Sequence, residues 1–136
     1  MQNKKIIVKT KSKSYPIYFG DGIVDRTNIL IKKYLPKVKK IVIISDKNLP
    51  PVLLKKLCHS LKKFDLKIYK ISSSEKMKNF TVAYNLTENL LKDNLSRSDC
   101  VISLGGGIVS DISAFVSSLT KRGVKFVNIP TTLLAQ

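Results

Sequence analysis

The amino-acid sequence predicts an α/β fold, a Rossmann-like and mostly parallel sheet with helices on both faces and an amino-terminal β-hairpin. Short runs of β-branched residues alternate along the chain with longer segments in which apolar residues recur at helical spacing. Strands that alternate with amphipathic helices are joined by right-handed crossovers, which makes the sheet parallel and covers both of its faces. The length of 136 residues and the hydrophobic content of 43% are those of one folded domain with its own core.

The hairpin is predicted at the start of the chain. Residues 4–9 (KKIIVK) and 15–20 (YPIYFG) are two short apolar segments, and the polar stretch 10–14 (TKSKS) between them has the length and composition of a hairpin loop. A helix is predicted next, because apolar residues recur at helical spacing before the following strand. These apolar positions are Ile23, Ile29, Leu30 and Tyr34.

The rest of the chain alternates between strands and helices. Strands are predicted from β-branched runs at residues 40–46, 66–72, 100–104 and 124–129. The helix after the first of these strands begins at Pro50 and Pro51, which suit a first helical turn. Its apolar face consists of Val52, Leu53, Leu57 and Leu61. The next two helices are predicted over about residues 79–92 and 108–120.

The chain is strongly basic, with a formal net charge of +16. A basic surface is the usual footprint of a nucleic-acid partner, but arginine, which is preferred for bidentate recognition of phosphates and bases, occurs only at Arg26, Arg97 and Arg122. The lysines are scattered, without interleaved aromatic residues. We therefore expect a solvated lysine-rich surface and no nucleic-acid partner. A basic, non-enzymatic binding module stays an alternative, which a salt-dependent complex with a polyanion would favour.

The sequence predicts neither a metal site nor a membrane segment. Cys58 and Cys100 lie far apart in apolar contexts and are expected to be buried free thiols. The sole histidine, His59, is expected at a helix surface, and a transition-metal site with three or four ligands cannot be assembled from these residues. The chain has no apolar run of about 18 residues and no signal-peptide core, which predicts a soluble, cytoplasmic protein without a membrane partner.

Three consecutive glycines lie between a predicted strand and a predicted helix, in residues 102–111 (ISLGGGIVSD). In sheets of this kind ligands lie beyond the carboxyl ends of the strands. Glycines there let the backbone approach a ligand, and the helix that follows presents free N–H groups to a pyrophosphate. The run departs from the G-x-G-x-x-G fingerprint, because Ser110 stands in the third glycine's place and no acidic residue follows about 20 residues later. Asp111 could equally serve to complement the helix dipole.

Residues 103–115 (SLGGGIVSDISAF) and 121–136 (KRGVKFVNIPTTLLAQ) resemble the 3-dehydroquinate synthase family, the zinc- and NAD-dependent sugar phosphate cyclases. The family pattern is a GGG-x-x-x-D loop, an RG before a strand and then PTTLLAQ. Residues 14–23, 45–48 and 75–78 are similar to the family's opening strand, D-x-N turn and E-x-x-K loop. Related polyol dehydrogenases of the glycerol type share the glycine loop but not the LLAQ ending. The NAD-binding domain of such a dehydrogenase stays an alternative.

The resemblance implies a set of NAD contacts at the strand ends. Carboxylates accept ribose hydroxyls, glycine N–H groups and threonine hydroxyls meet phosphate oxygens, and a lysine adds charge. The implied residues are Asp46, Asn48, Glu75, Lys78, Gly106, Gly107, Asp111, Thr131 and Thr132. The local alternatives are an ordinary turn at residues 46–48, a surface acid at residue 75 and a capping pair at residues 131–132. Arg122 matches a family arginine that reaches the substrate phosphate in a neighbouring subunit, which implies a homodimer.

The implied reaction converts 3-deoxy-D-arabino-heptulosonate 7-phosphate to 3-dehydroquinate, a step of the shikimate pathway of aromatic amino acid biosynthesis. Bound NAD oxidises one alcohol transiently, phosphate leaves, and the ketone is reduced again. The family's zinc ligands and substrate lysines follow the region matched here. We therefore expect residues 1–136 to be the NAD-binding amino-terminal domain, without the carboxyl-terminal helical domain, catalytic residues or metal ligands, and inactive alone. The sequence departs from the family at Ser110, which replaces a glycine, and at residues 118–121.

Overall fold

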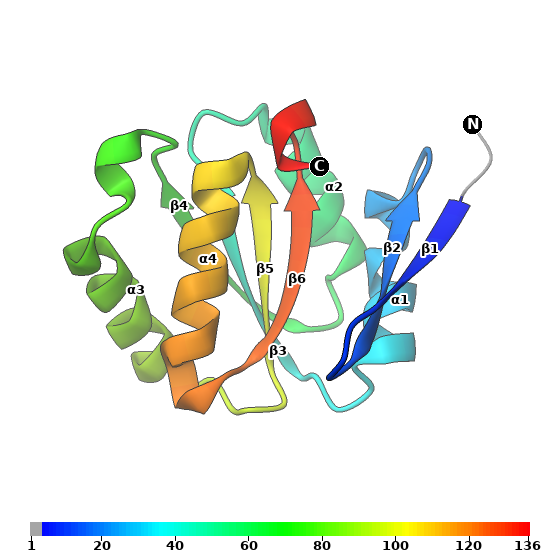
Figure 1. Ribbon diagram of the computed structural model, residues 1–136, viewed down its shortest axis with the longest axis horizontal. Helices are drawn as coiled ribbons and strands as arrows, with labels where there is room; N and C mark the ends of the chain where they lie inside the picture. Colours follow the sequence, from blue (N-terminus) through cyan, green and yellow to red (C-terminus); the bar gives the residue numbers. More distant parts are fainter. Residues whose placement is uncertain (1–3) are drawn as a thin grey trace.

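Four parallel strands form the central sheet of the computed structural model, which describes residues 4–136. The strand order is β4-β3-β5-β6, and every neighbouring pair is parallel. The strands are β3 (Lys40–Asp46), β4 (Asp65–Ile71), β5 (Cys100–Gly105) and β6 (Lys125–Pro130). Their carboxyl ends meet at one edge of the sheet, the upper edge in Figure 1. The predicted α/β class with a parallel sheet is confirmed.

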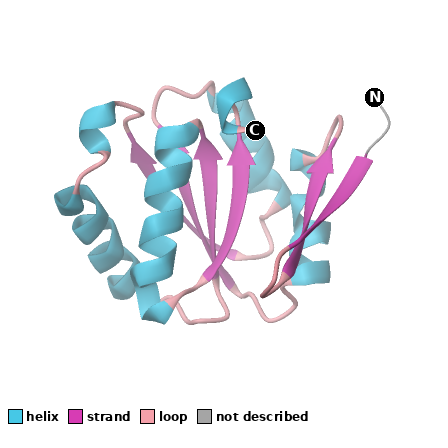
Figure 2. Cartoon of the chain, in the orientation of Figure 1, coloured by secondary structure: helices cyan, strands magenta, loops and turns pink. Residues whose placement is uncertain are grey.

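Helices cover both faces of this sheet because the strand residues alternate between two buried clusters. Figures 1 and 2 show α4 in front of the sheet and α2 behind it. The helices are α1 (Thr27–Tyr34), α2 (Pro51–Ser60), α3 (Phe80–Lys92) and α4 (Gly107–Leu119). One cluster joins the sheet to α3 and α4 and includes Val42, Ile44, Val101, Leu86, Leu90, Val109 and Val116. The other joins the opposite face to α1 and α2 and includes Ile41, Ile43, Ile102, Ile31, Leu57 and Leu61.

The hairpin forms a separate two-stranded antiparallel sheet, as predicted, from β1 (Lys4–Lys9) and β2 (Ser14–Phe19). Thr10 closes its turn, because its hydroxyl donates to the Lys13 carbonyl at 2.8 Å and accepts from the Lys13 N–H at 3.1 Å. The hairpin contacts α1 through a hydrogen bond of 2.6 Å between the hydroxyls of Tyr18 and Tyr34.

Single-turn 3-10 helices occur at four places in the described chain: η1 (Val24–Arg26), η2 (Glu75–Met77), η3 (Thr120–Arg122) and η4 (Leu133–Ala135). The helix predicted from Ile23 onward therefore begins as η1, and the α-helix itself starts at Thr27, whose hydroxyl donates to the Val24 carbonyl at 2.9 Å. None of the helices within residues 4–136 has the length and apolar character needed to span a membrane.

The two cysteines differ in burial. Cys100 is fully buried and free, as predicted, and burial together with the neighbouring Asp99 raises the pKa of its thiol to about 12. The prediction of a buried thiol is wrong for Cys58, which is free but only half-buried on α2. His59, the next residue of the same helix, is exposed, as predicted.

Candidate functional site

The residues predicted to contact NAD lie at the carboxyl ends of the four parallel strands. Asp46 is the last residue of β3, Glu75 follows β4, Gly106 follows β5 and Thr131 follows β6. The chain passes from β3 outward to β4 and then returns to β5 on the other side of β3. Ligands of open α/β sheets bind at such a reversal of strand order. The topology therefore gathers these residues where a ligand is expected.

Only one of the three glycines lies in the loop between the strand and the helix. Gly105 is the last residue of β5, Gly106 is the N-cap of α4 and Gly107 is its first helical residue. None of the three has a positive φ angle, so the need for glycine here comes from space and not from backbone conformation. A single residue thus separates the strand from the helix.

Two of these glycines are explained by packing within the chain. A Cβ atom at position 105 would lie 2.9 Å from the Cβ of Val109, so Gly105 permits close contact between β5 and α4. A Cβ atom at position 106 would lie 3.2 Å from the Cγ2 of Thr132, which follows β6. Gly106 therefore allows the β6 end to approach the start of α4.

Gly107 has no such internal explanation. A Cβ atom there would meet no atom within 4 Å among the described residues. Within residues 4–136 no side chain caps α4 at its amino end, and its first backbone bond runs from the Ser110 N–H to the Gly106 carbonyl at 3.0 Å. The earlier N–H groups of the helix therefore have no side-chain acceptor within the described chain, which is the arrangement that binds phosphates.

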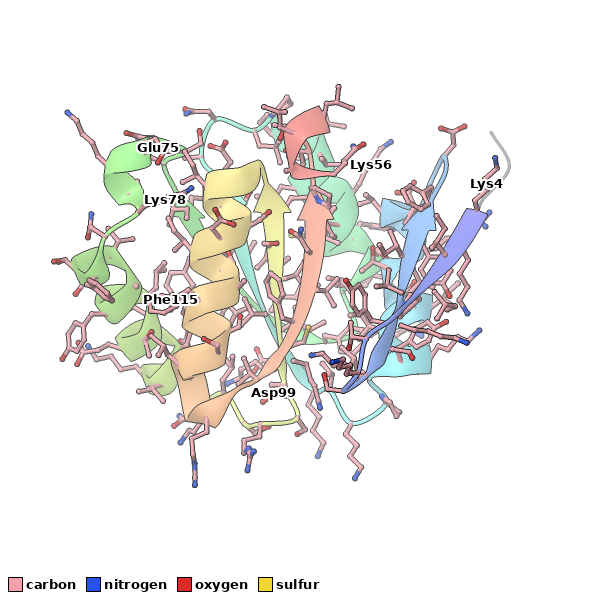
Figure 3. The ribbon with its side chains drawn as sticks, in the orientation of Figure 1. Lys4, Lys56, Glu75, Lys78, Asp99 and Phe115 are labelled. Atoms are coloured by element: carbon pink, nitrogen blue, oxygen red, sulfur yellow. The ribbon has the colours of Figure 1, made fainter. Side chains whose placement is uncertain are left out.

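Lys78 joins two of the predicted site residues. Its Nζ lies 3.1 Å from Oδ2 of Asp111 on α4 and 3.8 Å from Oε1 of Glu75 on η2. The hydrogen bond to Asp111 and the charge of Glu75 raise the pKa of Lys78. All three side chains are exposed, and Figure 3 shows Glu75 and Lys78 at the end of the sheet where α4 begins. The E-x-x-K segment and the glycine-loop helix thus meet through one lysine.

Asp46 and Asn48 form the local turn that the sequence left as an alternative. The Asn48 N–H donates to Oδ1 of Asp46 at 2.9 Å, and the Leu49 N–H donates to the Asp46 carbonyl at 3.2 Å. These bonds fix the carboxylate at the end of β3. Its Oδ2 atom has no hydrogen-bond partner among the described residues. The turn and a ligand contact are therefore compatible.

Thr131 and Thr132 connect β6 to the glycine run. The Thr131 N–H donates to the Gly105 carbonyl at 2.9 Å, and the Thr132 side chain faces Gly106. Thr132 is the N-cap of η4, but its side chain makes no capping bond within the described chain. Thr132 therefore occupies a capping position, but its hydroxyl does not cap the helix.

Asn128 was missed by the sequence reasoning. Its Oδ1 accepts hydrogen bonds from the hydroxyls of Ser103 on β5 at 2.5 Å and of Ser110 on α4 at 2.8 Å. Ser110, which occupies the third-glycine position of the G-x-G-x-x-G pattern, thus links α4 to β6. The signal available in the sequence was a lone amide in the otherwise apolar core of the strand KFVNIP.

Arg122 lies apart from the other predicted site residues. It ends η3, with a positive φ of 62°, just before β6 begins at the amino edge of the sheet. A six-residue strand separates it from Thr131, a distance of about 20 Å along the sheet. Within one chain Arg122 and the glycine run therefore belong to opposite edges.

No group of three or more His, Cys, Asp or Glu side chains within residues 4–136 is arranged to hold a metal ion. The site at the carboxyl edge therefore consists of backbone N–H groups, hydroxyls, carboxylates and one paired lysine. Such a set can bind phosphates and ribose hydroxyls.

Comparisons with known proteins identify relatives of this chain. The family model described as 3-dehydroquinate synthase N-terminal matches residues 68–136. A 3-dehydroquinate synthase of Pelagibacter ubique is 42% identical over 132 residues, which are 97% of this chain and 36% of the relative. The chain thus spans a little over one third of the length of the curated relatives that it matches.

Solved structures share the fold. A crystal structure of 2-deoxy-scyllo-inosose synthase matches with a TM-score of 0.88 at 19% identity, over 97% of this chain and 37% of the other. A second structure of that enzyme, complexed with carbaglucose-6-phosphate, NAD+ and Co2+, matches with a TM-score of 0.85 at 18% identity, over 97% of this chain and 36% of the other. At these identities the likeness shows the fold alone.

Proposed function

The chain belongs to the 3-dehydroquinate synthase family, and we propose that residues 1–136 form the NAD-binding part of a 3-dehydroquinate synthase. The observation that carries this proposal is Gly107, the first residue of α4. It has open space in place of a side chain at a helix end that no side chain caps in the described structure. A dinucleotide pyrophosphate fits this cradle, because it needs close backbone approach and free N–H groups.

Different residues of the site are proposed to bind different parts of the dinucleotide. The backbone at Gly106 and Gly107 binds the pyrophosphate, and Thr131 and Thr132 meet it from the β6 side. Asn48 and the carboxylates of Asp46, Glu75 and Asp111 hold the riboses, and Lys78 adds positive charge to the site. When bound, NAD supplies the transient oxidation of a substrate alcohol, and this chain supplies orientation and electrostatics. The ion pair of Lys78 with Asp111 supports this role, since it links two of the loops that would enclose the cofactor.

The complete enzyme is proposed to act on a phosphorylated seven-carbon keto sugar acid, releasing phosphate and forming 3-dehydroquinate in the shikimate pathway. A divalent metal such as zinc would be held by residues beyond those described here. Arg122 would reach the substrate phosphate of a neighbouring subunit in a homodimer. Its place at the amino edge supports this role, because it cannot join the carboxyl-edge site of its own chain.

Substitution of Gly107 tests the proposal. We expect the chain to bind NAD with a dissociation constant of roughly 1 mM, weak because only one wall of the cleft is present. Gly107→Val should reduce the affinity at least tenfold, whereas the fold should survive because its Cβ meets no atom. Gly106→Val is less informative, since its side chain would also meet Thr132.

Ala114→Val is the matched control, because it adds the same branched side chain at an exposed position of the same helix. Isothermal titration with NAD and circular dichroism should be recorded for the wild type and both variants. Equal NAD affinity in the wild type and Gly107→Val would exclude the start of α4 as the pyrophosphate site.

A further inference from the structure

The side-chain oxygen of Asn128 connects the two elements that flank the glycine run. Ser103 lies near the end of β5, before the three glycines, and Ser110 lies in the first turn of α4, after them. The hydroxyls of both serines donate to Oδ1 of Asn128, at 2.5 Å from Ser103 and 2.8 Å from Ser110. One acceptor on β6 is therefore bonded to the strand before the glycine run and to the helix after it.

The end of β6 makes a second contact with the same turn, closer to the edge of the sheet. In the register of β5 and β6, Ser103 pairs with Asn128 and Gly105 pairs with Pro130. Just beyond this last pair, the Thr131 N–H donates to the Gly105 carbonyl at 2.9 Å. The strand β6 thus holds the turn at two levels, through the backbone at Thr131 and through a side chain at Asn128.

Burial explains only one of the two hydrogen bonds to Asn128. Ser103 is fully buried, and a buried hydroxyl needs a partner inside the protein. Ser110 is only half-buried, so its hydroxyl could donate to water instead. The side chain of Asn128 is itself exposed and gains little from apolar packing. The bond from Ser110 to Asn128 is therefore not required by burial, and its effect is to tie the first turn of α4 to the sheet.

We propose that Asn128 is a positioning residue of the nucleotide site, an inference that rests on the proposed function. By accepting from Ser103 and Ser110 together, Asn128 fixes the direction in which α4 leaves β5. This direction also sets where the N–H groups of the first helical turn point. Glycines have no side chains that could fix it, so the restraint comes from another element. A binding group needs such support, because a displacement of about 1 Å is enough to weaken a site.

Asn128→Leu tests the proposal, because it removes the acceptor and keeps a side chain of similar size. The Ser110 amide, which donates to the Gly106 carbonyl, reports on the first turn of α4. In the variant its hydrogen exchange should accelerate about tenfold more than the exchange of amides in β3, because the turn opens locally. In NAD titrations followed by amide chemical shifts, the affinity should fall about fivefold. Asn128→Asp keeps Oδ1 and should restore slow exchange at Ser110.

Val127→Ala is the matched control. Val127 is the neighbour of Asn128 on β6, but it packs against the cluster on the opposite face of the sheet. Its truncation should lower the stability of the fold and leave the NAD affinity unchanged. Ser110→Ala should weaken NAD binding as Asn128→Leu does. The double variant should bind NAD no more weakly than either single variant, because both changes remove the same hydrogen bond.

Two results would overturn the inference and assign Asn128 to stability alone. One is wild-type NAD affinity in folded Asn128→Leu and Ser110→Ala. The other is faster hydrogen exchange spread evenly over the sheet. Failure of the wild-type chain to bind NAD is a different outcome, because it rejects the proposed function. The exchange rate of the Ser110 amide then decides by itself whether Asn128 orients α4.

Discussion

At the scale of single residues, the structure distinguishes the glycines that are explained by packing inside the chain from the one that leaves space for a ligand. Gly105 is required by the close contact with Val109, and a side chain at position 106 would crowd Thr132. Gly107 has no such neighbour among the described residues, which is why it carries the functional proposal. The three consecutive glycines are identical in the sequence, but each has different surroundings in the structure. The sequence alone therefore could not show which of them has space for a ligand.

The ion pair between Lys78 and Asp111 leads to a prediction at this scale. Asp111→Ala should leave the midpoint of urea unfolding almost unchanged, because exposed ion pairs contribute little to stability. NAD affinity should fall about tenfold if the carboxylate binds a ribose hydroxyl. Chemical denaturation and NAD titration of the same preparation check both halves. A variant that lost stability but kept its NAD affinity would assign Asp111 a structural role only.

At the scale of elements, Asp99 joins the amino ends of β3 and β5. Its Oδ1 accepts from the N–H groups of Lys39 at 3.2 Å and Lys40 at 2.9 Å, and its Oδ2 accepts from the N–H of Ser96 at 2.9 Å. Figure 3 shows Asp99 at the lower end of the sheet, away from Glu75 and Lys78. Burial of the carboxyl opposes ionisation, but the hydrogen bonds from Lys40, Ser96 and Lys39 prevail and lower the pKa of Asp99.

Loss of this carboxylate should therefore destabilise the fold in a pH-dependent way. Asp99→Ala is expected to lower the free energy of unfolding by about 3 kcal/mol at pH 6, because buried N–H groups lose a charged acceptor. Since the folded pKa lies below the unfolded value of about 3.9, this contribution is present above pH 4 and is lost as the pH falls through the folded pKa. Urea unfolding at pH 6 and pH 3 checks the sign. A difference between wild type and variant that stayed constant or grew at pH 3 would contradict it.

The strands and helices could largely be predicted from the sequence, whereas the contacts between them could be predicted only in part. The strands were found because buried parallel strands are continuous β-branched runs, as in 40–46 (KIVIISD). Helix α4 begins one residue before the predicted start, because Gly107 is already helical. The contacts of Asn128 could not be predicted, since they depend on how β5, β6 and α4 pack. The sequence motifs indicated the candidate site residues, and the strand order of the structure shows that they lie at one edge of the sheet.

At the scale of the whole molecule, the two edges of the sheet differ in character. The carboxyl edge holds the glycine run, the ion pair of Lys78 and a hollow whose lining includes Lys47, Lys55 and Lys70. The amino edge holds Arg122 and the hydrogen bonds of Asp99. Figure 1 shows both edges on one sheet, separated by the length of the strands. This separation is compatible with the proposed nucleotide site at one edge and with the proposed role of Arg122 in a neighbouring subunit at the other.

This division leads to an expectation about turnover. A polypeptide of residues 1–136 alone, supplied with zinc and NAD, should release no phosphate from the keto sugar acid phosphate. No three potential metal ligands come together in its described part, and the proposed reaction needs a divalent metal. A phosphate-release assay, with the full-length Pelagibacter ubique relative as positive control, checks this. Turnover above that of a heat-inactivated sample would show that the chain holds a complete active site.

Mapping the amide chemical-shift changes that NAD causes in this chain tests most directly whether the carboxyl edge of the sheet is the nucleotide site. The largest changes are expected at Gly106, Gly107 and Ile108, with smaller ones at Asp46 and Thr132. Amides at the amino edge, around residues 96–99 and 121–123, should not move. Changes centred on the amino edge, or scattered over the surface without a maximum at the start of α4, would contradict the assignment of the glycine run to the pyrophosphate.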